Sequence, residues 1–224
     1  MRRIFRISAA LLAASLVLTA CGYEEERRPR VTAEEQCDGT VSAAAAPALR
    51  RALATERFSD VPAGWLAGAA AQLKADYPYR RSSVGVPTYC AASAEKGRNT
   101  LKVDFDLYDE QALGGGHLSD PFMYPYDLGV EAYAGYRRVY LYVKCVSPQL
   151  KGSQQDPARI RGTLQVVRST TPDTTGTRED NLVVLHSVML ATVRELGCVR
   201  DAGLPSKPVF KAKKPSRVWP QGPI

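Results

Sequence analysis

The stretch Leu101-Lys102-Val103-Asp104-Phe105-Asp106-Leu107-Tyr108 decides the fold of this chain. Apolar residues alternate in it with charged residues and a tyrosine, which is the period of a half-buried β-strand. Such a strand places all its apolar side chains on one face of a sheet. That face must be covered, so the stretch predicts a sheet with helices packed against one side.

Three other segments, residues 84–90, 139–145 and 160–166, show a similar alternation. Turn residues at 96–99 separate the first of them from the strand at 101–108. Residues 109–137 lack a regular pattern and are expected to be irregular. The chain therefore predicts a four-stranded, mostly antiparallel sheet.

Helical patterns occur in three segments, residues 38–54, 65–76 and 178–197. Pro47 predicts a kink or a late start in the first of them, because proline removes a backbone hydrogen-bond donor. About three helices on such a sheet define an α+β fold. We expect residues 37–202 to form one domain and residues 203–224, which are basic and rich in proline, to form an extended tail.

The N-terminus has the layout of an export signal. Arg2, Arg3 and Arg6 precede an apolar run at residues 7–20, which is shorter than the roughly 20 residues of a membrane-spanning helix. The run ends in Leu18-Thr19-Ala20-Cys21, which resembles the lipobox of bacterial lipoproteins.

This resemblance implies an address for the mature protein. Residues 1–20 would be removed as a signal peptide, and Cys21 would become diacylated. Residues 21–36 would then tether the domain to the extracytoplasmic face of the cell membrane. The Arg2-Arg3 pair leaves both ordinary and twin-arginine export open.

The chain as a whole is similar to the small, uncharacterised lipoproteins that actinobacteria export. The likeness rests on the lipobox, on Cys37-Asp38-Gly39 and on the helix-forming segment at residues 186–198. It implies a membrane-anchored location, and no activity comes with it.

Four further cysteines are present: Cys37, Cys90, Cys145 and Cys198. An even number in an exported chain is typical of two disulfides, and no Cys-x-x-Cys pair suggests zinc. Three connectivities are possible. We predict Cys37–Cys90 and Cys145–Cys198, because each pair joins a helix end to the core-facing side of the nearest strand. The similar hairpin patterns around Cys90 and Cys145 also suggest a weak internal duplication.

The charge of the chain is mildly basic. There are 30 Lys and Arg against 23 Asp and Glu, and three of the basic residues belong to the expected signal peptide. The remaining excess is too small to suggest a nucleic-acid partner.

Residues that could carry catalysis do not form a known constellation. The two histidines are His117 and His186, and no Gly-x-Ser-x-Gly occurs. Ser93 and Lys96 match a Ser-x-x-Lys pattern, but the partner motifs of penicillin-recognising enzymes are missing.

Asp104 and Asp106 share one face of the strand at 101–108. They could act as a carboxylate pair or bind Ca²⁺, but we favour a solvated strand face on which Lys102 is a neutralising neighbour. We therefore expect no catalytic residue, no metal site and no cofactor.

Aromatic residues are the most suggestive feature of the middle of the chain. Tyr124, Tyr126, Tyr133, Tyr140 and Tyr142 are the candidates for a binding surface. Coverage of one end of the core explains the same rings and is the more ordinary interpretation. We expect a non-catalytic module that binds an envelope protein, a glycan or a small ligand. A cell-envelope hydrolase with an unrecognised active site is the alternative function.

Overall fold

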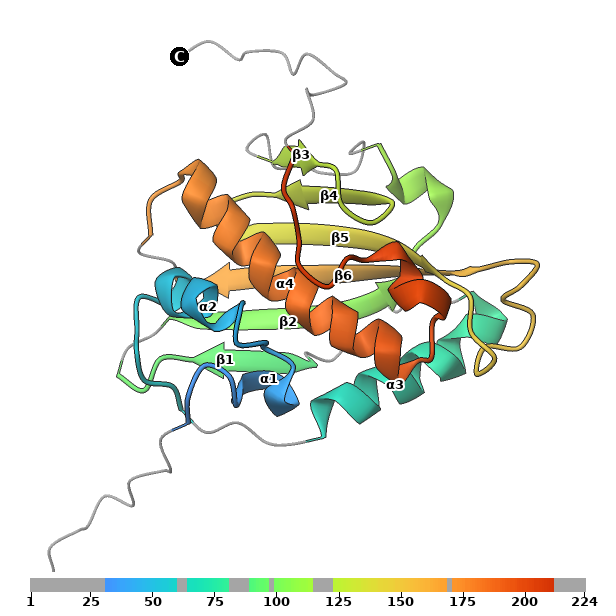
Figure 1. Ribbon diagram of the computed structural model, residues 1–224, viewed down its shortest axis with the longest axis horizontal. Coiled ribbons are helices and arrows are strands. Elements are labelled where there is room, and N and C mark those ends of the chain that lie inside the picture. Colours follow the sequence, from blue (N-terminus) through green and yellow to red (C-terminus); the bar gives the residue numbers. More distant parts are fainter. Residues whose placement is uncertain are drawn as a thin grey trace, which may run out of the picture.

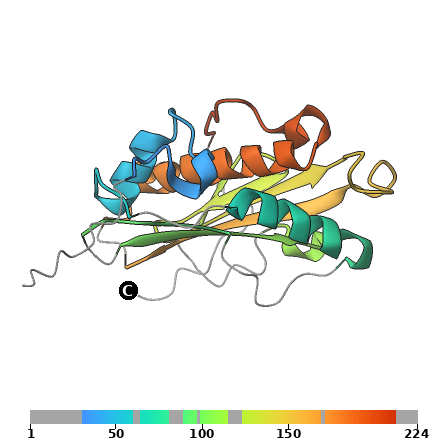
Figure 2. The same cartoon turned by 90° about the horizontal axis from the view of Figure 1, so that it is seen from below.

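The computed structural model describes residues 31–59, 64–80, 89–96, 99–114, 123–168 and 171–211. These residues form an α+β fold with one six-stranded antiparallel sheet and four α-helices. All four helices lie on one side of the sheet, and no α-helix of the described residues lies on the other (Figures 1 and 2). We call the two sides the helix-covered face and the helix-free face.

The strands pair in the order β1-β2-β6-β5-β4-β3, so the last strand of the chain lies in the middle of the sheet. Every neighbouring pair is antiparallel. β6 pairs with β5 on one side and with the whole of β2 on the other. It therefore connects the β1–β2 hairpin to the rest of the sheet. The strands are β1 (Cys90–Ser93), β2 (Thr100–Leu107), β3 (Tyr124–Tyr126), β4 (Glu131–Ala134), β5 (Arg138–Cys145) and β6 (Ala158–Val167).

The expected number of four strands is wrong, because residues 109–137 contain β3 and β4. β3 has three residues with Pro125 at its centre, and β4 has four. Runs this short do not show an alternation that stands out from a loop. Residues 84–88 of the expected first strand lie outside the described residues, and β1 begins at Cys90.

The α-helices are α1 (Gln36–Gly39), α2 (Ala46–Leu53), α3 (Trp65–Asp76) and α4 (Thr175–Glu195). The segment expected as one helix at 38–54 is thus divided, and Pro47 lies in the first turn of α2, where its missing N–H costs no hydrogen bond. α4 begins after Thr174, whose hydroxyl accepts from the backbone N–H of Thr177 at 3.1 Å. Within the described ranges, none of the helices is both long and apolar enough to cross a membrane.

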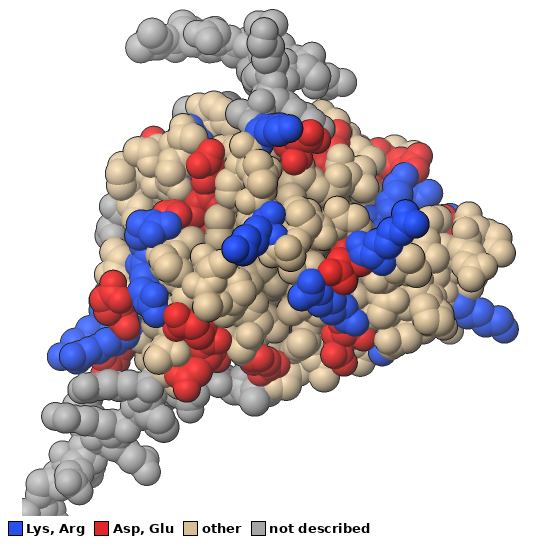
Figure 3. Space-filling view, in the orientation of Figure 1, with Lys and Arg blue, Asp and Glu red and all other residues tan. Residues whose placement is uncertain are grey.

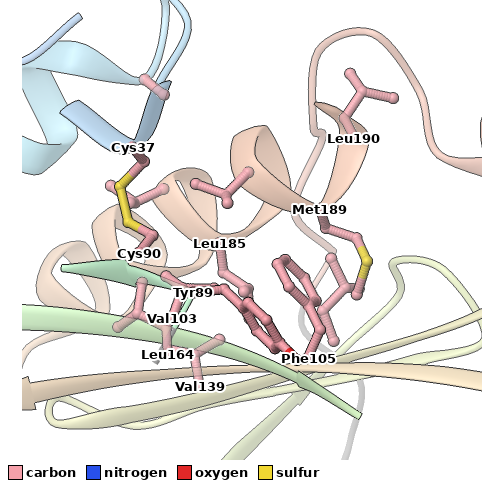
Figure 4. Close-up of a cluster of buried hydrophobic side chains, with 14 of the residues drawn as sticks. Cys37, Tyr89, Cys90, Val103, Phe105, Val139, Leu164, Leu185, Met189 and Leu190 are labelled. Carbon is pink, nitrogen blue, oxygen red and sulfur yellow. A yellow bond between two sulfur atoms is a disulfide. The ribbon is translucent and has the colours of Figure 1, made fainter. Parts of the chain in front are cut away.

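The core lies between α4 and the helix-covered face. The apolar side chains of the 101–108 alternation are buried there, as the sequence predicts, and Val103 has 0% exposure. Figure 4 shows Leu185 and Met189 pointing from α4 towards the sheet, whereas Leu190 points away from it. The apolar surface of α4 is therefore larger than the area that packs on the sheet.

Two disulfides fix helical segments to strands on the helix-covered side. Cys37 of α1 is bonded to Cys90, the first residue of β1, and the Cα atoms are 5.0 Å apart. Cys145, the last residue of β5, is bonded to Cys198, which follows α4, with Cα atoms 5.2 Å apart. These are the pairs expected from the sequence. Because Cys90 begins its strand and Cys145 ends its own, their positions lend the suggested duplication no support.

The domain begins earlier than expected. Val31 forms a β-bridge with Phe58, and Ala33 is fully buried. Residues 31–36, expected to belong to the tether, are therefore part of the packed domain. Residues 21–30 lie outside the described residues.

The domain also ends later than expected, because residues 204–211 run back from the C-terminal end of α4 towards β3 (Figure 1). We call this segment the C-terminal strap. Leu204 is 5% exposed, and the ring of Phe210 lies edge-on to Tyr126 with centroids 5.9 Å apart. The carbonyl of Lys211 accepts from the backbone N–H of Asp127 at 3.0 Å. Leu204 and Phe210 therefore anchor the C-terminal strap to the domain. The proline and lysine content of this segment predicted an unpacked tail.

Charges of both signs are mixed on the helix-covered side. Figure 3 shows basic and acidic side chains interspersed among uncharged ones. Two of the ion pairs are Arg51–Asp180 at 2.6 Å and Arg194–Asp201 at 2.8 Å. Among the residues described in this view there is no extended basic surface of the kind that binds nucleic acid.

Candidate functional site

The helix-free face carries two rows of aligned side chains across four strands. Cross-strand partners on an antiparallel sheet point to the same side. The first row runs Asp106, Arg161, Tyr142 and Glu131, and the second runs Asp104, Thr163, Tyr140 and Tyr133. Both rows run from β2 through β6 and β5 to β4, so the pairing of β2 with β6 brings charged and aromatic residues from distant parts of the chain together.

An ion pair lies at one end of the first row. Arg161 Nε donates to Asp106 Oδ1 at 2.9 Å, and its Nη2 donates to the other carboxylate oxygen, so the contact is bidentate. Asp106 is only 6% exposed. Burial raises the pKa of the Asp106 carboxyl, and the hydrogen bonds and charge of Arg161 oppose that rise. The expectation of a solvated acidic strand face is therefore wrong for Asp106, which Arg161 holds in place.

Tyr142 is the centre of an aromatic group beside this ion pair. Tyr108 lies edge-on to it with ring centroids 5.0 Å apart, and Tyr133 lies edge-on at 6.5 Å. Tyr140 stacks beside it at 6.4 Å. We call Tyr108, Tyr133, Tyr140, Tyr142, Arg161 and Asp106 the tyrosine–arginine cluster. Edge-on and offset rings attract one another, so these contacts stabilise the arrangement of the four rings.

The phenol groups of Tyr108, Tyr133 and Tyr142 stay protonated at neutral pH. Burial raises the pKa of Tyr108 to about 12, and it also raises the pKa values of Tyr133 and Tyr142. The Tyr133 hydroxyl donates to Glu131 Oε2 at 3.2 Å. The Tyr108 hydroxyl oxygen is buried, and none of the described residues forms a hydrogen bond with it. The cluster therefore holds a fixed guanidinium and phenol donors at known positions.

The five tyrosines expected to form one surface lie on two sides of the sheet. Tyr133, Tyr140 and Tyr142 belong to the cluster, with Tyr133 and Tyr140 partly exposed and Tyr142 buried. Tyr124 and Tyr126 pair with Ala134 and Ala132, whose side chains face the helices.

These two tyrosines have structural partners on that side. Tyr124 stacks under Arg178, whose guanidinium carbon lies 3.9 Å from the ring centroid, and Tyr126 is buried against Phe210. The expectation of one five-tyrosine surface is wrong, because the β3–β4 register turns these two rings to the helix-covered face.

Tyr108 and Arg161 are members of the cluster that the sequence did not single out. Arg161 occupies the polar phase of the predicted strand at 160–166, and Tyr108 that of the strand at 101–108. The sequence therefore predicts that both side chains lie on the polar sides of their strands. It does not predict that they belong to one cluster, because only the β2–β6 register shows that the two strands are neighbours.

The other residues considered for chemistry are dispersed. Ser93 Oγ lies 3.1 Å from Thr100 Oγ1, in the hairpin partner strand. His186 is in α4, on the opposite side of the sheet from the cluster. Cys21 and His117 lie outside the described residues. Within the part of the chain that the structure describes, no three His, Cys, Asp or Glu side chains gather closely enough to hold a metal ion.

No protein-family model, curated protein or solved structure matches this chain.

Proposed function

We propose that this protein is a lipid-anchored, extracytoplasmic binding protein of the cell envelope that contacts its partner through the tyrosine–arginine cluster. One observation carries the proposal: three tyrosine rings pack around Tyr142 beside a bidentate Asp106–Arg161 pair, on the face that no described α-helix covers. Tyrosine and arginine dominate the binding energy of protein interfaces, because they combine large rigid surfaces with directional hydrogen bonds.

The proposed address rests on the N-terminal sequence. The basic residues, the apolar run and the lipobox ending at Cys21 occur in the order of a lipoprotein signal. Two disulfides in one small domain suit an oxidising compartment. We place the protein on the outer face of the cell membrane, held there by lipid on Cys21.

The proposed partner is another protein of the envelope. The partly exposed members of the cluster, Tyr133, Tyr140 and Arg161, lie on three neighbouring strands, and a surface of this breadth suits a macromolecule better than a small ligand. A glycan is the alternative partner, because it also stacks on tyrosine rings. Contact binding of this kind needs no cofactor, and we expect no nucleic-acid partner.

The alternative of a hydrolase has less support. Ser187 Oγ donates to the Thr40 carbonyl at 2.8 Å and accepts from the Ser42 backbone N–H at 2.9 Å, so its hydroxyl is engaged in structure. Ser93 lies beside Thr100. Within the described residues, neither serine has the hydrogen bond to a histidine that activates a nucleophile.

A photocrosslinking experiment tests the binding role. A benzophenone amino acid is placed at Tyr140 of the full, membrane-anchored chain, and at Tyr79 as a matched control outside the cluster that is 68% exposed. We expect a discrete protein adduct in native membranes from position 140 only, and its loss with Arg161→Ala. Equal adducts from both positions, or an adduct with glycan alone, would contradict the proposed partner.

A separate substitution tests the address. Cys21→Ser removes the thiol that lipidation needs, and we expect the protein to leave the membrane fraction or to keep its signal segment. Ser42→Ala is the control, because it changes a residue of the domain and not the lipobox. A Cys21→Ser protein that fractionates and migrates like the wild type would exclude lipid anchoring.

A further inference from the structure

A third row of side chains lies next to the tyrosine–arginine cluster on the helix-free face. Gln165 of β6 pairs with Lys102 of β2 on one side and with Arg138 of β5 on the other. Each of the three lies two residues along its strand from a member of the row that contains Tyr140, so its side chain points to the same face. We call Lys102, Gln165 and Arg138 the basic row.

The two cations of the basic row are not neutralised within the domain. Lys102 and Gln165 are exposed, and Arg138 is partly exposed. Among the residues that the structure describes, neither Lys102 nor Arg138 forms an ion pair. Both charges are therefore available to a partner.

The other cations on this face are already paired. Asp106 holds Arg161 in a bidentate contact. Arg159 and Lys144 both reach Glu110, with nitrogen-to-oxygen distances of 3.3 and 3.5 Å. The uncompensated positive charge of the helix-free face is thus concentrated in the basic row.

The acidic residues near the basic row are engaged elsewhere. Asp104 lies two residues from Lys102 on the same face, and Glu95 lies in the turn before β2; each is partly exposed and has an interaction of its own. On the other side of the sheet, Asp180 of α4 is paired with Arg51 at 2.6 Å. These carboxylates therefore do not take the place of a partner for Lys102 and Arg138.

Two further arginines add positive charge at this end of the sheet. Arg137 precedes β5 and Arg168 follows β6, and the carbonyl of Arg137 accepts from the backbone N–H of Val166 at 2.8 Å. Both arginines are exposed, and neither forms an ion pair with another described residue. At physiological salt, charges attract over a range of about 8 Å, so neighbouring cations reinforce one another.

We propose that the basic row binds acidic side chains of the protein partner, in a segment that lies across β2, β6 and β5 beside Tyr140. The inference rests on the proposed function, because it takes the partner to be a protein that contacts this face. Lys102 and Arg138 offer charged donors to carboxylates, and Gln165 between them offers an amide donor.

The spacing of the row fits an extended segment. Neighbouring strands are about 4.8 Å apart, so Lys102 and Arg138 start from backbone positions about 10 Å apart, which is the length of about three residues of an extended chain. One short segment with several acidic residues therefore reaches both cations.

Hexaglutamate and hexaglutamine are the probes that test this inference. They have the same length and nearly the same side-chain shape, but only hexaglutamate is charged. The full chain is labelled with nitrogen-15 and held in nanodiscs of phosphatidylcholine, and the backbone amide signals of the basic row are followed. The photocrosslinking from position 140 tests separately whether a protein partner exists, so the two proposals can fail independently.

We expect hexaglutamate to shift the basic-row signals saturably, with an affinity at least tenfold above that of hexaglutamine and falling as salt is added. Lys102→Glu/Arg138→Glu turns attraction into repulsion and should weaken hexaglutamate binding at least tenfold. Lys151→Glu/Lys207→Glu is the matched control, because it reverses two exposed charges outside the sheet, and it should leave the binding unchanged. Lys102→Gln/Arg138→Gln serves in place of the first variant if that variant does not fold.

Several results would overturn the inference. They are the absence of a saturable shift, equal affinities for the two peptides, and equal effects of the two double glutamate variants. Shifts of the basic row caused by phosphatidylglycerol discs and not by hexaglutamate would assign it to the membrane surface instead. A protein adduct from position 140 that Lys102→Glu/Arg138→Glu retains in full would leave the proposed function standing and refute the acidic partner.

Discussion

Gly162 of β6 lies directly under Met189 of α4. A Cβ atom at position 162 would be 2.8 Å from Met189 Cε and 3.1 Å from both Leu185 Cδ1 and Phe105 Cε1. Gly162 does not have a positive φ, so the requirement for glycine comes from space alone. The missing side chain lets the longest helix approach the central strand of the sheet.

Gly162→Ala should destabilise the protein by about 1–3 kcal/mol, because an extra methyl group in a packed core forces its neighbours to move. Gly68→Ala is the control, since a Cβ at that position in α3 meets nothing within 4 Å and alanine favours helix. Urea unfolding should show a loss for the first variant and a small gain for the second. A Gly162→Ala protein as stable as the wild type would contradict the close packing of α4 on β6.

Arg161→Met should cost about 3 kcal/mol of stability, because it leaves the Asp106 carboxylate buried without its partner. Burial alone then raises the pKa of Asp106 further, so the carboxyl takes up a proton more readily. The loss should therefore shrink as the pH falls, which urea unfolding at several pH values measures. The double variant Asp106→Leu/Arg161→Met should recover most of the stability, and a double variant worse than the single one would refute this account.

Removing the Cys145–Cys198 disulfide should lower the free energy of unfolding by about 4 kcal/mol, because the bond closes a long loop in the unfolded chain. The variant is Cys145→Ala/Cys198→Ala, studied by urea unfolding. Cys37→Ala/Cys90→Ala provides the comparison, since both bonds span 53 residues and should contribute equally. A loss below 1 kcal/mol in both variants would mean that the bonds do not constrain the unfolded chain.

Acid should destabilise the protein through His186. Its pKa is lowered from 6.5 by burial, so the unfolded chain binds a proton where the folded one does not. The stability due to neutral His186 is complete above pH 6.5, and it is lost as the pH falls towards the lower pKa of the folded state. The slope for one proton is at most about 1.4 kcal/mol per pH unit.

His186→Phe should flatten this part of the pH profile, as urea unfolding between pH 5 and pH 7.5 would show. Arg194, Glu195 and Lys207 line the same cavity as His186. Glu195→Gln, which removes the acidic group of these three, is the control. An unchanged slope in His186→Phe would assign the effect to other groups.

The regular parts of this fold could be predicted from the sequence, because their signals are local. The alternation at 101–108 identifies β2, and the apolar pattern at 65–76 gives the bounds of α3. β3 and β4 could not be predicted, since seven residues in two strands carry too little periodic signal. The packed strap was missed because Leu204 and Phe210 are isolated apolar residues among prolines and lysines.

The candidate site was only partly predictable for a different reason. Tyr140 and Tyr142 could be assigned to the polar side of a strand from the sequence. Their association with Arg161, Asp106 and Tyr108 depends on which strands are neighbours, and strand order is a property of the whole chain.

The central position of β6 has a consequence for how the domain matures. A chain that emerges from a membrane with its N-terminus first presents β1 and β2 long before β6, and β2 has no partner on its inner side until residues 158–167 arrive. Neither half of the sheet can be completed earlier, because β5 also pairs with β6. The helix that closes the core comes later still. Assembly is therefore delayed until nearly the entire domain has emerged, and during that interval the inner edge of β2 is open to pairing with other extended chains.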